Sequence, residues 1–454
     1  MSKDWETLAG GQGQKPTTGR LGRAIKLGGL ATRVTGSLIA GGIKGKILGK
    51  ERGAAAQADV FMKNADRIVE TMGQLKGAAM KIGQMLSIDT DGLPPEFVDR
   101  LSALQKSAPP MDWDTLRGQV EGALDRPIED AFQFFDPEPI GSASIGQVHK
   151  ARLFDGTDVA VKIQYPGIAQ TLESDLKNLS TLLNLGRVFA SRERLEGFLE
   201  EARQSLLEEA NYTLEAENLV KYGPLLSSLP GIRTPKAFPE LTAPTVLTME
   251  FIEGQKIDDG LMAMTDVEAQ QQILERFIHA FVWMFHDHQI IHADPHPGNF
   301  LLTEDGDIAL LDFGCISTFS ETFSDGMLHL LKAYWDRDGQ ATRDHYRRLG
   351  FGPEDGTLPS AEMLVEYHDL ILTPMGHRGP FNFGDWAVNA QIRKFMRTHL
   401  EFLKMVPPPE SLMYFRVVAG IKGLLNRVAV PVDVHAQAVA AAVRRGIVPE
   451  GAYR

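Results

Sequence analysis

Two strand-like segments joined by a turn constrain the fold more than any other feature of this sequence. QVHKARLF (147–154) and DVAVKIQY (158–165) have strand-like patterns, and Asp155-Gly156 between them is a typical hairpin turn. FQFF (132–135) before the pair and TVLTMEFI (245–252) after it have the same character. The sequence therefore predicts a small region that is rich in β-structure.

Most of the remaining chain has helical periodicity. Residues 54–87 carry apolar side chains spaced by three and four positions, which draws one stripe along a helix, and residues 168–222 also have a helical pattern. From residue 262 onward the periodicity is helical, interrupted only by HADPHPGN and by the strand-like IALLDF (308–313). We therefore expect an α+β protein in which a small β-rich lobe precedes a large helical lobe.

Length and composition are those of a globular protein. With 454 residues, of which 43% are hydrophobic, the chain is long enough for one large two-lobed domain or for two domains. The single cysteine, Cys315, excludes an intramolecular disulfide and fits a reducing compartment. No stretch approaches the roughly 18 apolar residues that a membrane-spanning helix needs, and no signal peptide is evident. These features predict a cytoplasmic location.

Charge is unevenly distributed along the chain. The net charge is −12, but residues 1–50 hold nine Lys and Arg against two acidic residues. This basic, Gly-rich segment is either a solvated tail or a contact for an anionic membrane surface, such as the face of the inner membrane. VTGSLIAGGI (34–43) is too short to cross a bilayer as a helix, although it can lie on one. We expect no nucleic-acid partner.

A loop of small residues between two strands is the first candidate site. GSASIGQV (141–148) matches the kinase loop pattern G-x-G-x-x-G-x-V, except that Ala143 replaces the middle glycine. Small residues allow backbone N–H groups to approach phosphate oxygens, although they also form ordinary β-turns. The residues of this loop that we predict to bind a nucleotide are Gly141, Ser142, Ala143, Ser144, Gly146 and Val148.

The strand after this loop ends its apolar run in a lysine. In VAVK (159–162), Lys162 follows three apolar residues, and a lysine on a buried strand needs a carboxylate or a phosphate as its partner. A lysine at the sheet edge that points to water is the alternative. Because Lys162 follows a phosphate-type loop, we predict that it contacts a nucleotide.

HADPHPGNFLL (292–302) and the following LLDFG supply the polar groups for phosphate chemistry. Asp294 and Asn299 have the five-residue spacing of the kinase catalytic loop, and Asp312 follows a hairpin-like turn at EDGD (304–307). Mg²⁺ binds few protein oxygens together with phosphates, so Asn299 and Asp312 are its predicted ligands and Asp294 orients or deprotonates a nucleophile. No third zinc ligand accompanies the histidines, so we expect His292 to be a packed structural residue.

Several motifs together resemble one family. The chain resembles the UbiB family of atypical kinase-like proteins, also called AarF-domain kinases, from about residue 76 to its helical C-terminal part. The motifs that carry this resemblance are KGAAMKIGQMLS (76–87), PIGSASIGQVHKA (139–151), VAVKIQYPGI (159–168), EEANYTLEAEN (208–218) and HADPHPGNFLL. The resemblance implies a bilobal protein-kinase-like fold with an N-terminal helical extension.

The resemblance also implies roles for individual residues. Lys162 would pair with Glu215, in preference to Glu173, and the helix with the K-x-G-Q residues Lys81 and Gln84 would cover the active site. Glu209 is the first member of a family E-x-D pair. Asn211 stands where the family commonly has the aspartate, and asparagine is the weaker metal ligand.

A second strand supplies the predicted adenine contacts. In MEFIEG (249–254), the backbones of Glu250 and Ile252 would meet adenine and Met249 would line the pocket behind it; a plain strand followed by a turn is the alternative. The predicted organisation is a basic tail (1–52), a helical extension (53–125), an N-lobe (126–253) and a C-lobe (254–454).

The resemblance implies an ATP- and Mg²⁺-dependent atypical kinase or ATPase. Family members are tied to ubiquinone and other isoprenoid lipids, so a quinone or isoprenoid lipid, or the enzymes that make it, are the expected partners. Two other functions remain open. One is a small-molecule kinase of the aminoglycoside or choline type, and the other is a non-catalytic scaffold that nucleotide regulates.

Overall fold

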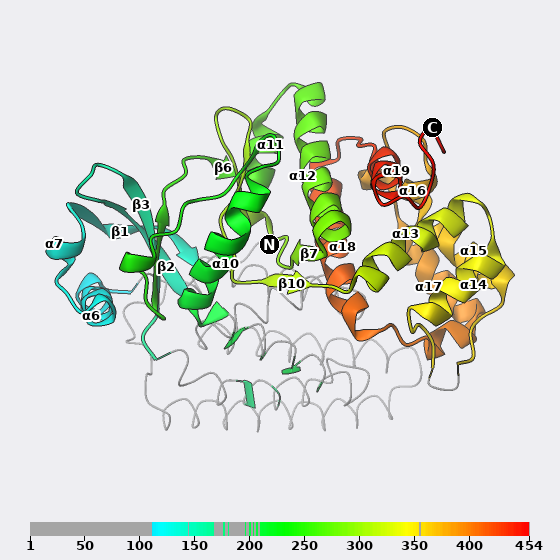
Figure 1. The fold of residues 1–454 in the computed structure, drawn as a ribbon, viewed down its shortest axis with the longest axis horizontal. Coiled ribbons are helices and arrows are strands. Elements are labelled where there is room, and N and C mark those ends of the chain that lie inside the picture. Colours follow the sequence, from blue (N-terminus) through cyan, green and yellow to red (C-terminus); the bar gives the residue numbers. More distant parts are fainter. Residues whose placement is uncertain are drawn as a thin grey trace, which may run out of the picture. The chain divides into compact units, whose positions relative to one another are not determined.

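The computed structural model describes residues 111–143, 145–167, 209–353 and 356–453, together with a few isolated positions between 176 and 207. The chain divides into two compact units (Figure 1). Among the described residues, the sheet unit comprises those between 111 and 214 together with Phe238–Met249, and the helical unit comprises Glu215–Ala237 and those from Glu250 onward. The predicted tail and the predicted helix over 54–87 lie outside the described residues.

The sheet unit is built on four strands in the order β1-β2-β3-β5, with two helices before the first strand. Strands β1, β2 and β3 pair antiparallel with their sequence neighbours. This arrangement confirms the predicted β-rich region. The elements are α6 (Trp113–Leu124), α7 (Ile128–Ala131), β1 (Phe134–Ala143), β2 (Gly146–Arg152), β3 (Asp158–Gln164) and β5 (Val246–Glu250).

The hairpin between β2 and β3 forms where the turn signal predicted it. Arg152 lies opposite Asp158 in the register, and their side chains form an ion pair with 2.6 Å between Nε and Oδ1. Gly156 in the connecting loop has φ +90°, a backbone conformation that costs glycine little. The hairpin therefore follows from the turn residues, and the ion pair between Arg152 and Asp158 joins the two strands next to the turn.

The first strand differs from the prediction. β1 begins at Phe134 instead of residue 132 and continues to Ala143 through Pro137 and Pro139, with irregular register around Pro139. Because β1 is the first strand in the sheet order, its outer side has no ladder partner within this sheet and it tolerates the missing N–H groups of proline.

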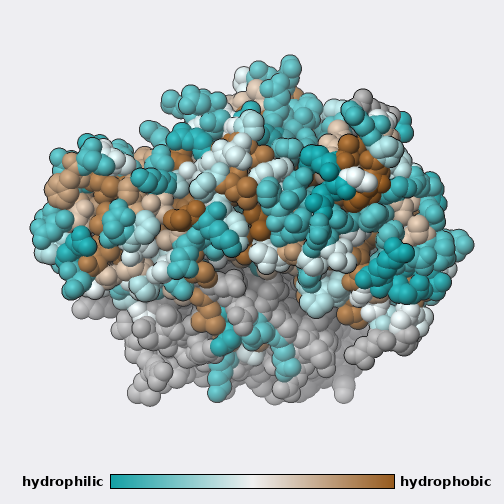
Figure 2. All heavy atoms as spheres, in the orientation of Figure 1, coloured by the Kyte–Doolittle hydropathy of each residue, from teal (hydrophilic) through white to brown (hydrophobic). Residues whose placement is uncertain are grey.

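The core of the sheet unit lies between the sheet and α6. Leu116 and Val120 of α6 are completely buried and belong to one cluster with Val159, Val161 and Ile163 of β3. Asp112 caps this helix by accepting a hydrogen bond from the N–H of Thr115. Figure 2 shows scattered hydrophobic residues on the visible face of the molecule. In the sheet unit, the large apolar side chains of Phe134 and Phe154 are exposed. Single exposed apolar residues of this kind are normal on a soluble surface.

Helices dominate the second unit, as predicted. Its longest helix, α12 (Val267–His288), starts at the capping residue Asp266. The other helices of eight or more residues in the described part of this unit are α10 (Tyr212–Leu226, whose first turn belongs to the sheet unit), α13 (Glu321–Trp335), α14 (Gly339–Arg348), α15 (Ala361–Ile371), α17 (Val388–Thr398), α18 (Pro409–Val428) and α19 (Val434–Arg444).

Two small sheets accompany these helices. One has the order β4-β9-β8-β6 and the other pairs β7 with β10. Strands of two or three residues are too short to produce a periodic pattern, so the sequence did not predict β4, β6, β7 or β10. The bounds are β4 (Ile232–Arg233), β6 (Gln255–Lys256), β7 (Ile290–His292), β8 (Phe300–Leu302), β9 (Ile308–Leu310) and β10 (Ile316–Thr318).

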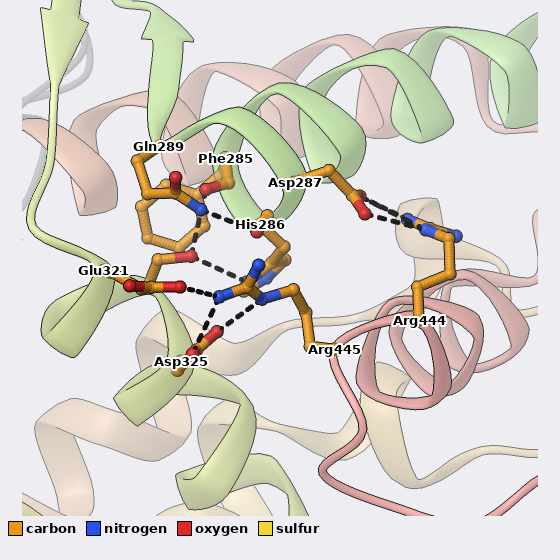
Figure 3. Close-up of polar contacts among 9 residues, drawn as sticks. Phe285, His286, Asp287, Gln289, Glu321, Asp325, Arg444 and Arg445 are labelled. Atoms are coloured by element: carbon orange, nitrogen blue, oxygen red, sulfur yellow. Dashed lines mark hydrogen bonds and ion pairs between the residues drawn. The ribbon is translucent and has the colours of Figure 1, made fainter.

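Ion pairs fasten α19 to α12 and α13 (Figure 3). Arg444 binds Asp287 near the end of α12, with 2.8 Å between Nη2 and Oδ2. Arg445 bridges two carboxylates of α13, at 2.8 Å from Nε to Asp325 and 2.5 Å from Nη2 to Glu321. Two carboxylates beside one guanidinium raise the pKa of Arg445. The chain after residue 430 is thereby joined to helices more than a hundred residues earlier.

In the described part of the chain, no helix combines the length and the apolar character needed to cross a membrane.

Candidate nucleotide and magnesium site

The predicted phosphate loop lies at the turn from β1 to β2. Ala143 faces Gly146 across the turn in the register of the two strands. The backbone of Ser142 belongs to β1, whereas Ser144 lies outside the described residues. The chain therefore reverses sharply at the position where the motif requires small residues.

The two glycines of this motif differ in whether the surrounding structure has room for a Cβ atom. A Cβ on Gly146 would lie 2.2 Å from the carbonyl oxygen of Ile163 and 2.9 Å from the hydroxyl of Tyr212, so only glycine fits there. A Cβ on Gly141 would meet nothing within 4 Å. Packing thus accounts for Gly146, while Gly141 is a position where packing does not demand glycine.

Lys162 is a buried lysine on β3. It lies opposite Val148 in the register, its side chain is 6% exposed, and its Nζ lies 4.9 Å from the centre of the Tyr212 ring. Contact with the face of an aromatic ring partly offsets the desolvation of the ammonium group. The alternative of an exposed lysine at the sheet edge is therefore wrong. The sequence analysis did not identify Tyr212 as a neighbour of Lys162.

The stretch 293–299 follows β7 and ends in a one-turn 3-10 helix, Pro297–Asn299. Asp294 is 9% exposed, and the side-chain amide of Asn299 donates a hydrogen bond of 3.0 Å to its backbone carbonyl. Because the NH₂ group of Asn299 is used within the turn, its amide oxygen is the atom suited to a cation. His296 accepts a hydrogen bond from the N–H of Gly298 at 3.1 Å, which gives this histidine a role in the turn.

His292 is a structural residue, as predicted. It is completely buried, and its Nε2 donates to the backbone carbonyl of Asp312 over 2.6 Å. Its ring lies 5.3 Å from that of Phe300, between centroids. The hydrogen bond joins the turn that carries Asp294 to the segment that carries Asp312. Among the described residues, no group of three or more His, Cys, Asp or Glu is placed to hold a metal ion.

Asp312 lies in an irregular segment after the β8–β9 hairpin. The predicted strand over 308–313 ends at Leu310, because the chain turns so that the Oδ1 of Asp312 accepts from the N–H of Gly314 at 2.9 Å. The neighbouring Cys315 is buried. Ser320 caps α13 by accepting a hydrogen bond from the N–H of Phe323.

Helix α10 contacts the segment that follows Asp312. Glu215 is 2% exposed, and its Oε1 accepts from the N–H of Phe313 at 3.5 Å. One turn later, the side chain of Asn218 donates to the Phe313 carbonyl at 3.0 Å. Sequence reasoning missed Asn218, although its spacing of three from Glu215 places both on one helix face. Lys162 and Glu215 belong to different units, so their pairing remains a prediction.

The residues implied by the family motifs are only partly described. Glu209 is buried, whereas Lys81 and Gln84 lie outside the described residues. The exposed Asn211 precedes α10, and its Oδ1 accepts from the N–H of Leu214 at 3.4 Å. At this position, which departs from the family pattern, the side chain therefore caps a helix.

The predicted adenine-binding stretch contains two buried apolar residues, of which Met249 lies in β5 and Ile252 lies after its end at Glu250. Met249 and Ile252 are each 6% exposed. The N–H of Glu250 donates to the Lys236 carbonyl at 2.8 Å, which leaves only its carbonyl oxygen for a role in nucleotide binding. The predicted role of Glu250 is thereby narrowed to one atom.

Comparison with known proteins identifies the family. The model of the ABC1 atypical kinase-like domain matches residues 103–346. The chain belongs to this ABC1, or UbiB, family. The atypical kinase COQ8 of Saccharomyces cerevisiae mitochondria is 33% identical over 377 residues, covering 81% of this chain and 74% of the yeast protein. The mitochondrial atypical kinase coq-8 of Caenorhabditis elegans is 32% identical over 417 residues.

The alignment with the C. elegans protein includes 88% of this chain, but it includes only about half (54%) of the length of that relative. A solved structure described as the complex of Rv3197 with erythromycin, from Mycobacterium tuberculosis, is 26% identical with a TM-score of 0.61. The match covers 85% of this chain and 97% of the solved one. These comparisons confirm the family resemblance and the kinase-like α+β fold.

Proposed function

We propose that this protein binds ATP with Mg²⁺ and cleaves or transfers its terminal phosphoryl group, in support of ubiquinone or other isoprenoid-lipid biosynthesis. The observation that carries the proposal is the hydrogen-bonded frame that connects Asp294, Asn299 and Asp312. The side chain of Asn299 bonds to the backbone of Asp294, His292 bonds to the backbone of Asp312, and the carboxylate of Asp312 bonds to the N–H of Gly314, and these contacts support the proposed grouping of the three side chains.

Each of these groups has a proposed role. The carboxylate of Asp312 and the amide oxygen of Asn299 fit Mg²⁺, which prefers hard oxygen ligands and retains several waters and phosphate oxygens. Bound magnesium neutralises charge on the phosphates. The carboxylate of Asp294 orients the attacking hydroxyl or water and accepts its proton. His292 positions the segment of Asp312 without contacting the substrate.

The sheet unit supplies the proposed nucleotide contacts. The turn at Ala143 and Gly146 brings backbone N–H groups near the phosphates, and Lys162 contributes its positive charge. Ala143 has a Cβ where the common kinase loop has none, which restricts φ at this position. Met249, the carbonyl of Glu250 and Ile252 are the proposed adenine contacts.

The link to lipids rests on the names of the relatives. Proteins called COQ8 are the source of the proposed association with ubiquinone biosynthesis. The basic segment 1–50 supports attachment to an anionic membrane surface. The solved relative that is described as a complex with erythromycin favours a small organic molecule as the second candidate for the phosphoryl acceptor.

Hydrolysis of ATP by the purified chain tests this proposal. We would measure turnover with Mg²⁺ or with EDTA, with and without anionic liposomes, in the wild type and in Asp312→Asn. Asp305→Asn is the matched control, because Asp305 is an exposed carboxylate in the neighbouring hairpin turn. Magnesium-dependent turnover that is lost only in Asp312→Asn would support the proposal.

Two other results would replace the proposed function with a different one or refute it. Nucleotide binding without turnover in the wild type would favour the nucleotide-regulated scaffold. If neither ATP nor ADP bound to a folded wild-type chain, the assignment of the loop and of Lys162 would be wrong.

A further inference from the structure

The backbone around Asp312 is held by side chains instead of a strand ladder. β9 ends at Leu310, and residues 311–315 belong to neither a strand nor a helix. Backbone groups in such a segment still need partners, because a buried N–H or C=O without a hydrogen bond is costly. His292 provides the partner for the Asp312 carbonyl, and helix α10 provides both partners of Phe313. The orientation of this segment therefore depends on α10.

Asn218 of α10 makes the shorter of these two contacts with Phe313. Its Nδ2 donates to the carbonyl of the completely buried Phe313 over 3.0 Å. Glu215, one turn earlier, accepts from the N–H of the same residue over 3.5 Å. The first distance lies within the usual range of about 2.7–3.2 Å for such bonds and the second lies beyond it. The hold of α10 on this backbone therefore rests chiefly on Asn218.

The hydrogen bond from Asn218 reaches the carboxylate of Asp312 through one peptide group. The carbonyl of Phe313 and the N–H of Gly314 belong to the same planar group, so they point in opposite directions and rotate together. Asn218 binds the carbonyl, and the Oδ1 of Asp312 accepts from the N–H at 2.9 Å. A bond to the carbonyl also polarises the peptide and strengthens its N–H as a donor. Holding the carbonyl thus fixes the N–H that the carboxylate binds.

Gly314 makes this hold important. A Cβ on Gly314 would lie 3.2 Å from the Oδ1 of Asp312, which is tighter than ordinary contact, so the missing side chain allows the carboxylate to approach. Glycine also tolerates a wide range of φ, so the peptide group before it can turn over at little cost unless it is held. Such a turn would point the Phe313 carbonyl at the Asp312 carboxylate. Asn218 opposes the turn because its acceptor would move away.

We propose that Asn218 is a positioning residue for the magnesium site, because it holds the Phe313–Gly314 peptide so that its N–H orients the carboxylate of Asp312. This inference rests on the proposed function, in which Asp312 binds Mg²⁺. Asn218 itself does not bind the metal and acts only through the peptide. Its loss should weaken metal binding and leave the chemistry of the fully bound complex almost unchanged.

Binding of Mn²⁺ to the full chain is the first test. Mn²⁺ prefers the same oxygen ligands and octahedral geometry as Mg²⁺, and free Mn²⁺ is measured by electron paramagnetic resonance. We would titrate it with the ATP analogue AMP-PNP present, against a series without protein because the nucleotide also binds Mn²⁺. Asn218→Ala should raise the Kd about two- to tenfold, the effect of losing one hydrogen bond. Val220→Ala is the matched control on the same helix, because Val220 is neutral and 55% exposed; its Kd should stay within about twofold of the wild type.

The Mg²⁺ dependence of ATP hydrolysis separates positioning from catalysis. In Asn218→Ala, the Mg²⁺ concentration for half-maximal turnover should rise by the same factor as the Kd for Mn²⁺. kcat at saturating Mg²⁺ and ATP should stay within about twofold of the wild type. A merely structural defect in α10 would lower Tm without this selective change. Asn218→Leu, which retains bulk but lacks the donor, replaces Asn218→Ala if thermal unfolding shows that the latter does not fold.

Hydrogen exchange without metal or nucleotide tests the peptide connection directly. Mass spectrometry of fragments that contain residues 311–316 reports the protection of the Gly314 amide, which donates to Asp312. Asn218→Ala should speed exchange in these fragments by up to about tenfold, because the unheld peptide opens more often. Val220→Ala should leave it unchanged.

Three results would overturn the positioning role of Asn218. These are equal Mn²⁺ affinity in Asn218→Ala and the wild type, unchanged exchange in fragments of 311–316, or equal effects of Asn218→Ala and Val220→Ala. Failure of the proposed function looks different, because the wild type itself would then bind no Mn²⁺ with the nucleotide. In that case the magnesium role of Asn218 is wrong as well, even if exchange shows that Asn218 holds the peptide.

Discussion

Replacing Gly146 by alanine should destabilise the sheet unit. The new Cβ would lie 2.2 Å from the Ile163 carbonyl oxygen, a separation that real Cβ atoms essentially never show. Ile163 lies within β3, so a rigid, hydrogen-bonded strand would have to move by nearly 1 Å, instead of one flexible side chain. Overpacking of this kind costs about 1–3 kcal/mol.

The expected loss translates into a measurable shift. For a protein of about 150–250 residues, 1 kcal/mol corresponds to roughly 2–4 °C in Tm, so we expect Tm to fall by about 2–12 °C. Thermal unfolding followed by circular dichroism, without nucleotide, is the assay. The larger part of the shift should appear in the signal of the β-structure, because the clash lies within the sheet.

Gly141→Ala is the matched control, since it adds the same atom to the same loop. Nothing lies within 4 Å of that Cβ, so its free energy of unfolding should stay within about 0.5 kcal/mol of the wild type. Equal Tm values for Gly146→Ala and the wild type would refute the reasoning. An equal loss in both variants would refute it too, because the effect would then not come from the close contact.

Three further predictions concern stability. Burial holds the pKa of His368 at about 4 in the folded state, against 6.5 unfolded. As the pH falls, His368 is therefore protonated at a higher pH in the unfolded chain than in the folded chain. The free energy of unfolding should then fall by up to about 3 kcal/mol between pH 6.5 and 4. Urea unfolding across this range should show a shallower pH slope in His368→Gln; an unchanged slope would contradict the assignment. Arg445→Ala should cost about 1–2 kcal/mol in the same assay, and the control Arg347→Ala less than about 0.5, because Arg347 is 54% exposed and binds one carboxylate; equal losses would argue against the bridge to α13. Asn211→Asp should raise Tm at low salt by the equivalent of about 0.3–1 kcal/mol, because a negative charge at the start of α10 favours the helix; a gain that persists at 1 M NaCl would exclude this electrostatic cause.

Much of the fold could be predicted because its signals are local. The β2–β3 hairpin follows from alternation and a turn, and the capping of α13 by Ser320 follows from a serine before a helical pattern. The sequence pattern predicts a start of β1 at residue 132, two residues too early, because the apolar Phe132 packs in the core after α7 instead of joining the strand. In the sequence, a buried apolar residue next to a strand cannot be distinguished from an apolar residue within the strand.

The polar frame of the site could be predicted only in part. The positions of Asp294, Asn299 and Asp312 follow from motif spacing, but their supporting contacts do not. Asn218 and Phe313 are 95 positions apart, and His292 and Asp312 are 20 apart. Contacts between a side chain and a distant backbone carbonyl leave no pattern in the sequence, because any residue can present that carbonyl.

The ion pairs of α19 bear on how the protein is made. Asp287 and Arg444 are separated by 157 positions, so α12 leaves the ribosome long before its partner does. During that interval the α12 surface that later contacts α19 is uncovered, and chains in this state are prone to aggregate. A nonsense mutation just before Val434 would leave every motif residue in place and still yield a product that chaperones and proteases remove.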